Sequence, residues 1–268
     1  MYERFFGLKE KPFNVTADPG FLFFSRHHKE AFSHLVYGIK ERKGFLEITG
    51  EIGTGKTTLC KALLNSLDAN TKTALILNPD LSKAQLLRMM LQDLGVEDEK
   101  NSKTSLLTKL NQFLIQQLSS GNNVVLIIDE AQNLKDSLLE QIRLLSNLET
   151  EKEKLLQIVL VGQPELREKL KSPKLRQLRQ RISVRYHIFP LIRPEVDKYI
   201  RHRLSVAGSN RCVNFSKEAV DEIYSYSQGF PRLINILCDK LLLAAFVRTT
   251  KTITPELVQV CIQELEGN

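Results

Sequence analysis

The sequence predicts an α/β fold in which a five-stranded parallel sheet is followed by a C-terminal group of helices. Three observations predict it. From Gly44 onward, short and almost continuously apolar runs alternate with segments of helical periodicity. Such runs are typical of strands buried on both faces, and their alternation with helices is typical of parallel βαβ units. After Pro190 the strand-like runs stop and helical patterns continue.

The first forty residues are rich in phenylalanine and are interrupted by Pro12 and Pro19. The composition argues against a long helix. It predicts an irregular segment that aromatic anchors fix to a core. We therefore expect an N-terminal aromatic segment over residues 1–43, packed on the core. The anchors are Phe5, Phe6, Phe13, Phe21, Phe23 and Phe24.

The α/β domain is expected over residues 44–190. Helices are predicted at Ser105–Leu118 and Ser137–Leu148, because both place apolar residues along one stripe at helical spacing. Between such helices lie the runs that should form the sheet, the last of which is the weakest. These runs are Phe45–Thr49, Thr73–Asn78, Val124–Asp129, Leu156–Gly162 and Val184–Phe189.

A helical lid domain is expected over residues 191–268. Thr254 precedes Pro255, which suits a helix N-cap followed by proline at the first helical position. Phe230 and Pro231 open another helix directly after Gly229. The helical patterns cover Glu195–Val206, Lys217–Ser227, Arg232–Arg248 and Glu256–Glu266.

The composition, with a formal net charge of +7, is that of a globular protein. The positive net charge permits contact with nucleic acid or anionic lipid. An excess of lysine and arginine on an ordinary solvated surface explains the same charge equally well. The cysteines, at positions 60, 212, 238 and 261, lack CxxC spacing, which argues against zinc and disulfides. No signal peptide or transmembrane segment is apparent, so a soluble intracellular chain is expected.

The segment Gly50-Glu-Ile-Gly-Thr-Gly-Lys-Thr57 matches the phosphate-binding pattern G-x-x-x-x-G-K-[ST] in full. It follows an apolar run and opens a helical pattern, as the mechanism requires. Its glycines let backbone N–H groups surround phosphate oxygens, Lys56 supplies charge, and Thr57 offers a hydroxyl to Mg²⁺. ATP is expected to bind Gly50, Gly53, Thr54, Gly55, Lys56, Thr57 and Thr58.

Two acids, Asp129 and Glu130, follow the third apolar run. Alone they would be equally well explained as a charged turn at the surface. Beside a phosphate loop, Asp129 is expected to hold Mg²⁺ and Glu130 to orient or deprotonate the attacking water. Gln163 ends the next strand, where it either aligns that water or only terminates the strand before Pro164.

The segment from 167 to 185 is strongly basic, with one acid, Glu168. Three interpretations of this segment are open. It forms an ordinary solvated surface, it binds nucleic acid or acidic lipid, or it supplies an arginine finger to the nucleotide of a neighbouring subunit. Further on, Arg232 either folds back to the γ-phosphate or only starts a helix. The basic residues are Arg167, Lys169, Lys171, Lys174, Arg176, Arg179, Arg181 and Arg185.

In this order, these elements resemble the AAA+ superfamily of P-loop NTPases, and within it the ATPases of the general secretion pathway A (ExeA) family. Pilus-biogenesis and exosortase-associated ATPases belong to the same group. The resemblance covers nearly the whole chain. Besides the phosphate loop, its motifs are Phe5–Leu8, Pro12-Phe13, Asp18-Pro19, Ser25, His28–Ala31, Ile128–Gln132, Leu160–Leu166, Leu178–Ile182 and Gly229–Asn235.

The resemblance implies a role for several residues. Gln163 would be the first sensor and Arg232 the second. Arg181 would be the arginine finger, with Arg179 as the alternative. The segment Ser25–Ala31, and His28 in particular, would approach the adenosine end of ATP, although adjacency with His27 also fits a surface or structural residue.

The resemblance also implies a homo-oligomeric, cytoplasmic ATPase that works with secretion, pilus or polysaccharide-export proteins at the inner membrane. A DNA-binding regulator of the kind that selects transposition targets is the less favoured alternative. A slow nucleotide switch that docks a partner is the third. Longer family members continue into a transmembrane helix and a peptidoglycan-binding domain that this sequence lacks. The chain is thus either a short relative or part of a longer member.

Overall fold

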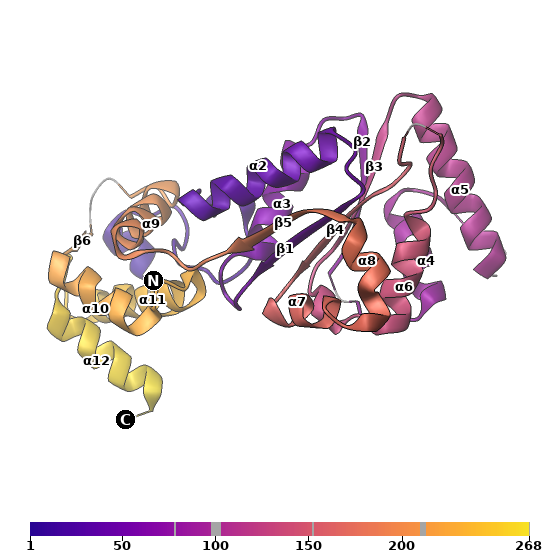
Figure 1. Cartoon of the computed structure of the whole chain (residues 1–268). Coiled ribbons are helices and arrows are strands. Elements are labelled where there is room, and N and C mark those ends of the chain that lie inside the picture. The colour runs from indigo at the N-terminus through magenta and orange to yellow at the C-terminus, as the bar shows by residue number, and fades with distance from the viewer. Residues whose placement is uncertain (78, 98–102, 152, 210–212, 268) are drawn as a thin grey trace. The chain divides into compact units, whose positions relative to one another are not determined.

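The computed structural model describes residues 1–77, 79–97, 103–151, 153–209 and 213–267. Asn78, the expected end of the second strand, and Cys212 lie outside them. The chain forms two compact units (Figure 1). The sheet unit comprises Lys29–Glu51 and Leu59–Ile188, and the helical unit comprises Met1–His28, Ile52–Thr58 and the residues from Phe189 onward.

Five parallel strands form the sheet in the order β2-β3-β4-β1-β5, which confirms the predicted sheet. Two strands, β2 and β5, begin two residues earlier than the sequence pattern indicated. The carboxyl ends of parallel strands meet at one edge, so the residues that follow β1, β3 and β4 are neighbours there. The strands are β1 Phe45–Gly50, β2 Thr71–Ile76, β3 Asn123–Ile128, β4 Gln157–Gly162 and β5 Ile182–Ile188.

Helices cover both faces of this sheet. On one face, Phe45, Leu126 and Ile158 belong to the same buried apolar cluster as residues of α4, α5 and α6. Figure 1 shows α2 on the other side of the strands from α7 and α8. The helices that follow the strands are α3 Lys56–Ser66, α4 Lys83–Asp93, α5 Lys103–Ser119, α6 Asp136–Leu145, α7 Pro164–Leu170 and α8 Arg176–Arg181, with short 3₁₀ turns at η2 Ala131–Asn133 and η3 Pro173–Leu175.

The helix α2, Arg26–Lys40, corrects the expectation that no long helix lies in the first forty residues. Its buried side chains include Ala31, Leu35 and Ile39, which recur at helical spacing. Gly38 lets the helix approach the sheet, because a Cβ there would lie 2.2 Å from the Cδ2 of Leu46 in β1. The phenylalanines and prolines that precede Arg26 concealed this periodicity.

The helical unit buries the N-terminal aromatic side chains. Phe6, Phe13 and Phe21 share one apolar cluster with Ile200 and Leu237 of the C-terminal helices. None of the described helices is long and apolar enough to cross a membrane. The segments 1–43, 44–190 and 191–268 stay predictions of domain organisation. The elements of this unit are α1 Tyr2–Phe6, η1 Pro19–Phe21, α9 Arg193–Val206, α10 Lys217–Ser227, α11 Pro231–Val247, α12 Pro255–Glu266 and the parallel pair β6 Asn214–Phe215 and β7 Thr252–Ile253.

A buried acid, Glu47, lies inside β1. Its side chain is 4% exposed. The Nε atom of Arg185 lies 3.2 Å from one carboxylate oxygen, and that of Arg167 lies 3.7 Å from the other. Burial raises the pKa of Glu47 above its ordinary value of 4.5, although both guanidinium groups act in the opposite direction. Ionising this carboxyl therefore costs the folded state free energy.

We expect Glu47→Gln to change the pH dependence of stability. A carboxyl whose pKa is raised by folding contributes stability that is present below its unfolded pKa and is lost as the pH rises through the folded value. The glutamine stays neutral, so the melting temperature of the variant should rise relative to wild type as the pH increases from the ordinary pKa of 4.5 through the raised pKa of the folded state. The control is Glu168→Gln, at an exposed surface pair with Lys171. A difference in melting temperature that does not change with pH would contradict this expectation.

Candidate functional site

The loop between β1 and α3 carries the match to the phosphate-binding pattern. Gly53 and Gly55 have φ angles of 81° and 93°, a region that residues with a Cβ rarely adopt. Successive N–H groups in such a backbone can form a concave anion-binding nest. Gly50 is the buried last residue of β1, while Thr57 and Thr58 are half-buried in the first turn of α3.

Lys56, the first residue of α3, is only 6% exposed. Burying an ammonium group is costly unless hydrogen bonds or an opposite charge compensate it. The amino end of a helix also favours an anion, because its N–H groups and its dipole are directed there. Both features suit a phosphate at the start of α3. The adjacent Thr54 is fully buried.

Two successive carbonyl groups of the loop are hydrogen-bonded from within the helical unit. The backbone N–H of Arg232 donates to the carbonyl oxygen of Gly53 at 3.2 Å. The Nε2 atom of His28 donates to the carbonyl oxygen of Thr54 at 2.9 Å, and its Nδ1 lies 2.7 Å from the hydroxyl of Ser25. The structure thus places His28 on the backbone of the phosphate loop.

The two acids lie at the carboxyl edge of the sheet, directly after β3. The side chain of Asp129 is 2% exposed and accepts a hydrogen bond from the backbone N–H of Glu130 at 2.9 Å. Glu130 has a φ of 51°, which is uncommon for a residue with a side chain. Such strain is often retained at functional sites. A buried carboxylate is also the kind of group that a cation stabilises.

Two glutamines hold the carboxylate of Glu130. The side-chain amides of Gln132 and Gln163 donate to its Oε2 at 2.5 Å and 3.1 Å. The amide oxygen of Gln132 also accepts from the backbone N–H of Gln163 at 3.0 Å. The sequence indicated Gln163 but assigned no role to Gln132. Gln132 lies within the motif Ile128–Gln132, which was the one available signal.

Comparisons with known proteins identify the family. A family model described as an AAA domain matches residues 39–170. The chain is also 44% identical over 270 residues to "General secretion pathway protein A" of Aeromonas hydrophila. The chain belongs to the AAA+ family, as a relative of that protein. The alignment takes in all of this chain and 49% of the Aeromonas protein, so the chain spans about half the length of its curated relative.

Solved AAA+ structures share the fold. The ORC2 protein of Aeropyrum pernix superposes with a TM-score of 0.69 at 16% identity, covering 96% of this chain and 72% of that one. Cdc6p of Pyrobaculum aerophilum gives 0.69 at 16% identity, with 98% and 70% covered. The RuvB Holliday junction branch migration motor of Thermotoga maritima gives 0.61 at 18%, with 90% and 69% covered. The predicted P-loop AAA+ fold class is thereby confirmed.

The segment Gly229–Arg232, which opens α11, is packed too closely for a side chain at Gly229. Gly229 has a φ of 76°, and a Cβ there would lie 1.9 Å from the carbonyl oxygen of Leu191. The backbone N–H of Leu191 donates to the carbonyl of Gly229 at 2.9 Å. A similar close approach exists at Gly53, where a Cβ would lie 2.8 Å from the Cβ of Arg232.

Gly229→Ala is therefore expected to destabilise the protein by about 2 kcal/mol or more, because it combines a left-handed backbone with a clash against another backbone. Thermal or urea unfolding measures the loss. Gly267→Ala is the matched control, since it has the same φ of 76° but no atom within 4 Å of the added Cβ. Equal losses of unfolding free energy in the two variants would show that the close contact with Leu191 does not contribute to the destabilisation.

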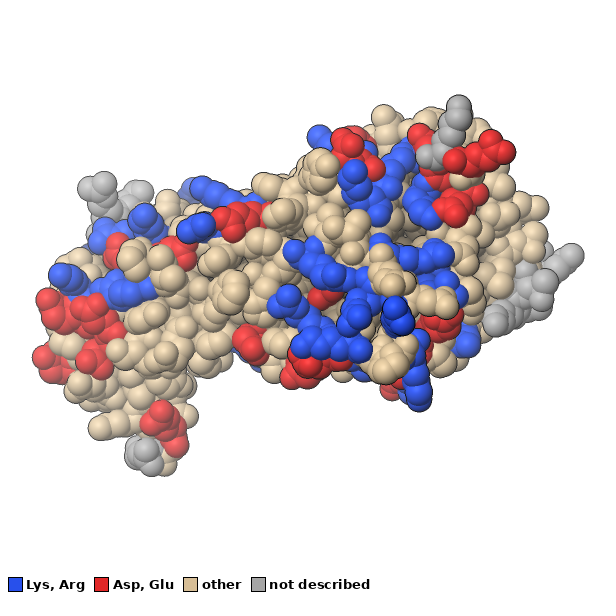
Figure 2. Space-filling view, viewed as in Figure 1, with Lys and Arg blue, Asp and Glu red and all other residues tan. Residues whose placement is uncertain are grey.

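The basic segment 167–185 divides by what its side chains contact. Arg181 is half-buried, and its Nη1 donates to the hydroxyl of Ser146 at 2.8 Å, whereas Arg179 is exposed. Lys169 donates to two backbone carbonyls of the turn after β3, and Arg167 and Arg185 pair with Glu47. Figure 2 shows that lysine and arginine side chains still gather on this face of the sheet unit, around α7 and α8.

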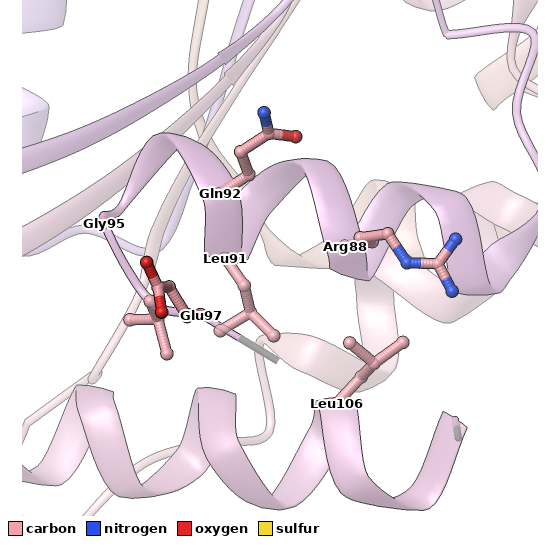
Figure 3. A pocket seen from close by; sticks show the side chains of 7 residues that line it. Arg88, Leu91, Gln92, Gly95, Glu97 and Leu106 are labelled. Atoms are coloured by element: carbon pink, nitrogen blue, oxygen red, sulfur yellow. The ribbon is translucent and has the colours of Figure 1, made fainter. Parts of the chain in front are cut away.

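A separate pocket lies in the sheet unit between α4 and α5 (Figure 3). Arg88 and Glu97 are the charged groups among its described lining residues. In open α/β sheets, ligands bind at the carboxyl ends of the strands. This pocket is formed by helices, and none of its described lining residues belongs to the segment Gly50–Thr57. Its other lining residues are Leu91, Gln92, Gly95, Val96 and Leu106.

Proposed function

We propose that this chain binds ATP with Mg²⁺ and hydrolyses it to ADP and phosphate. The conformation of the loop at Gly50–Thr57 carries the proposal, because two left-handed glycines precede a buried lysine at a helix start. Backbone N–H groups from Gly53 to Thr58 would bind phosphate oxygens, and Lys56 would neutralise the outer phosphates. The hydroxyl of Thr57 and the carboxylate of Asp129 would hold the magnesium ion, which lowers the repulsion between phosphate charges.

Glu130 would act as the general base. In hydrolysis a water oxygen forms a bond to the γ-phosphorus, the bond between that phosphorus and the ADP oxygen breaks, and the proton of the water passes to the carboxylate. Gln132 and Gln163 support this role, since both donate to one oxygen of Glu130 and so fix its direction. The role of Gln163 as a sensor would then run through Glu130.

Gln132→Ala is expected to lower kcat about tenfold and to leave nucleotide affinity unchanged, since misdirecting a catalytic group slows chemistry more than binding. Steady-state phosphate release and a titration with ADP separate the two quantities. Asn133→Ala, at the exposed neighbouring position, is the control. A rise in Kd without a fall in kcat would assign Gln132 to binding instead.

Arginines complete the proposed mechanism. Arg232 would contact the γ-phosphate within one subunit, which its backbone contact with Gly53 supports. Arg181, with Arg179 as the alternative, would stabilise the transition state in a neighbouring subunit. The exposure of Arg179 and the bond between Arg181 and Ser146 make it necessary to test both residues.

We further propose that the chain works as a homo-oligomer that drives the assembly or function of a secretion, pilus or polysaccharide-export apparatus, on the cytoplasmic side of the inner membrane. The 44% identity with general secretion pathway protein A supports this proposal. The structural relatives support only the fold, because their identities to this chain are low.

A mixing experiment tests the shared site. Glu130→Gln lacks the base, and Arg181→Ala or Arg179→Ala lacks the finger, so each is expected to be inactive alone. In a mixed oligomer, an intact base meets an intact finger, and ATP hydrolysis should partly recover. As control, Glu130→Gln mixed with Lys56→Ala should not recover, because neither subunit has a complete set of its own residues. No recovery with either arginine variant, and turnover per subunit independent of protein concentration, would rule out the shared site.

A DNA-binding regulator is the second candidate, and the basic surface of Figure 2 is the observation that favours it. The chain should then bind duplex DNA in an ATP-dependent manner, and the affinity should fall steeply as the salt concentration rises. Fluorescence anisotropy with a labelled duplex measures this, and Lys174→Glu with Arg176→Glu, both exposed, should reduce it. Absence of binding at low salt would remove this candidate.

A further inference from the structure

The phosphate loop is held by donors on the side of its carbonyl groups. Arg232 donates its backbone N–H to Gly53, and His28 donates its Nε2–H to Thr54, so two consecutive peptide groups are fixed. All of these residues belong to the helical unit. The described residues contain no cis peptide bond. In a planar trans peptide the C=O and the N–H point in opposite directions. Each bonded carbonyl therefore fixes the direction of the next residue's N–H.

The consequence is specific for Gly55. Its N–H shares a peptide group with the carbonyl of Thr54, so the bond to His28 directs this N–H away from the imidazole. Gly55 has a φ of 93°, and a Cβ at this position would lie 3.3 Å from the Nε2 of His28. The ring thus lies directly against the loop at the residue whose N–H it orients.

His28 is held in one tautomer for this contact. A carbonyl oxygen only accepts, so Nε2 must carry the proton. The Nδ1 atom of the neutral ring then accepts from the hydroxyl of Ser25, which lies 2.7 Å away. The backbone N–H of His28 also donates to that hydroxyl oxygen, at 3.3 Å. Both side chains are buried, with His28 at 3% and Ser25 at 2% exposure.

Desolvation agrees with a neutral ring. Burial lowers the pKa of His28 below its ordinary value of 6.5, and the bond to Thr54 opposes this shift. In a neutral imidazole, the hydrogen bond that one ring nitrogen makes decides which nitrogen carries the proton, and such a bond also fixes the orientation of the ring. Its hydrogen-bonding capacity is fully used by Ser25 and Thr54, which leaves it no donor for a base or ribose.

We propose that His28 is a positioning residue for the polyphosphate of the nucleotide, which it orients through the Thr54–Gly55 peptide group. The inference rests on the proposed binding of ATP and deepens it. It assigns His28 to the phosphate end of the ligand, whereas the family resemblance had assigned this segment to the adenosine end. Ser25 supports the same role by fixing the tautomer.

The test compares ATP with inorganic tripolyphosphate, which has no adenosine. Both are titrated against a fluorescent ADP analogue bound to the wild type, to His28→Phe and to His28→Gln. The phenylalanine keeps the ring volume but removes the donor, while the glutamine amide can restore a donor near the position of Nε2. His34→Phe is the matched control, since this histidine is exposed on the same helix. Thermal unfolding without ligand reports the fold.

His28→Phe is expected to lower the affinity for both ligands by about the same factor, roughly tenfold. The reason is that the carbonyl of Thr54 loses the hydrogen bond from His28, so this bond no longer fixes the loop. His28→Gln should recover most of this loss, and His34→Phe should equal the wild type. Loss of ATP affinity with unchanged tripolyphosphate affinity would overturn the inference in favour of an adenosine contact. Unchanged affinity for both ligands would overturn it as well.

Two further outcomes are separable. If the wild type bound neither ligand, the proposed function and this inference would both fall, whereas equal binding by wild type and His28→Phe overturns the inference alone. If His28→Phe did not fold, Ser25→Ala would decide. This variant leaves the ring but frees its tautomer, and should weaken the binding of both ligands about threefold. Wild-type affinity for both ligands in Ser25→Ala would then overturn the inference.

Discussion

Replacing Lys56 by alanine should weaken ATP binding by about 100-fold, equivalent to about 2.7 kcal/mol. The reason is the position of its ammonium group, which is 6% exposed at the first residue of α3. A buried charge–phosphate contact is stronger than one between solvated groups, and alanine leaves the phosphate charge without its partner. Calorimetric titration with a nonhydrolysable ATP analogue measures the change.

The same variant should not unfold the protein. Alanine removes a buried ammonium group together with the interactions that it makes, so a desolvation cost and its compensation are lost together, and the melting temperature without ligand should stay close to that of wild type. Lys61→Ala, further along α3, is the control for loss of a lysine from this helix. An affinity within about threefold of wild type in Lys56→Ala would contradict the assignment of the loop as the phosphate site.

Glu130→Gln should lower the rate of ATP hydrolysis by about 10²- to 10⁴-fold while retaining ATP, because it removes the proton acceptor and little else. Glutamine has the same shape and can still accept the bonds from Gln132 and Gln163 at its carbonyl oxygen. Phosphate release gives the rate, and nucleotide recovered with the protein after gel filtration gives the retention.

The control for this variant is Glu165→Gln, an exposed glutamate close in the chain to Gln163. It should hydrolyse ATP at the wild-type rate. If Glu130→Gln also turned over at that rate, Glu130 would not be the base. If it failed to bind ATP, the φ of 51° at this position would instead mark a residue needed to build the site.

The sheet was predictable from the sequence because its three central strands, β1, β3 and β4, are buried on both faces. The runs at β3 and β4 are almost purely apolar, and the run at β1 is apolar apart from Glu47 and Thr49. The three strands end at Gly50, Ile128 and Gly162, next to the candidate functional residues. Periodicity alone therefore located both the strands and the edge at which they present side chains. The phosphate loop was recognisable for the same reason, since its pattern is local in sequence.

Contacts between distant segments were not predictable in this way. Gln132 and Gln163 are 31 residues apart, and only the pairing of β3 with β4 brings the turns that follow them together. The bond between His28 and Thr54 likewise joins a helix to a loop 26 residues later. Helix α2 was missed because the aromatic segment before it dominated the composition of the first forty residues.

The most direct test of the central claim is phosphate release from Mg-ATP by the purified chain over many turnovers. The account predicts continuous release that far exceeds the amount of protein, is absent from Lys56→Ala and is reduced in Glu130→Gln. A chain that binds ATP but releases no more than a single phosphate per subunit, at the same rate as Glu130→Gln, would contradict it. That result would describe a nucleotide switch and not an ATPase that drives an apparatus.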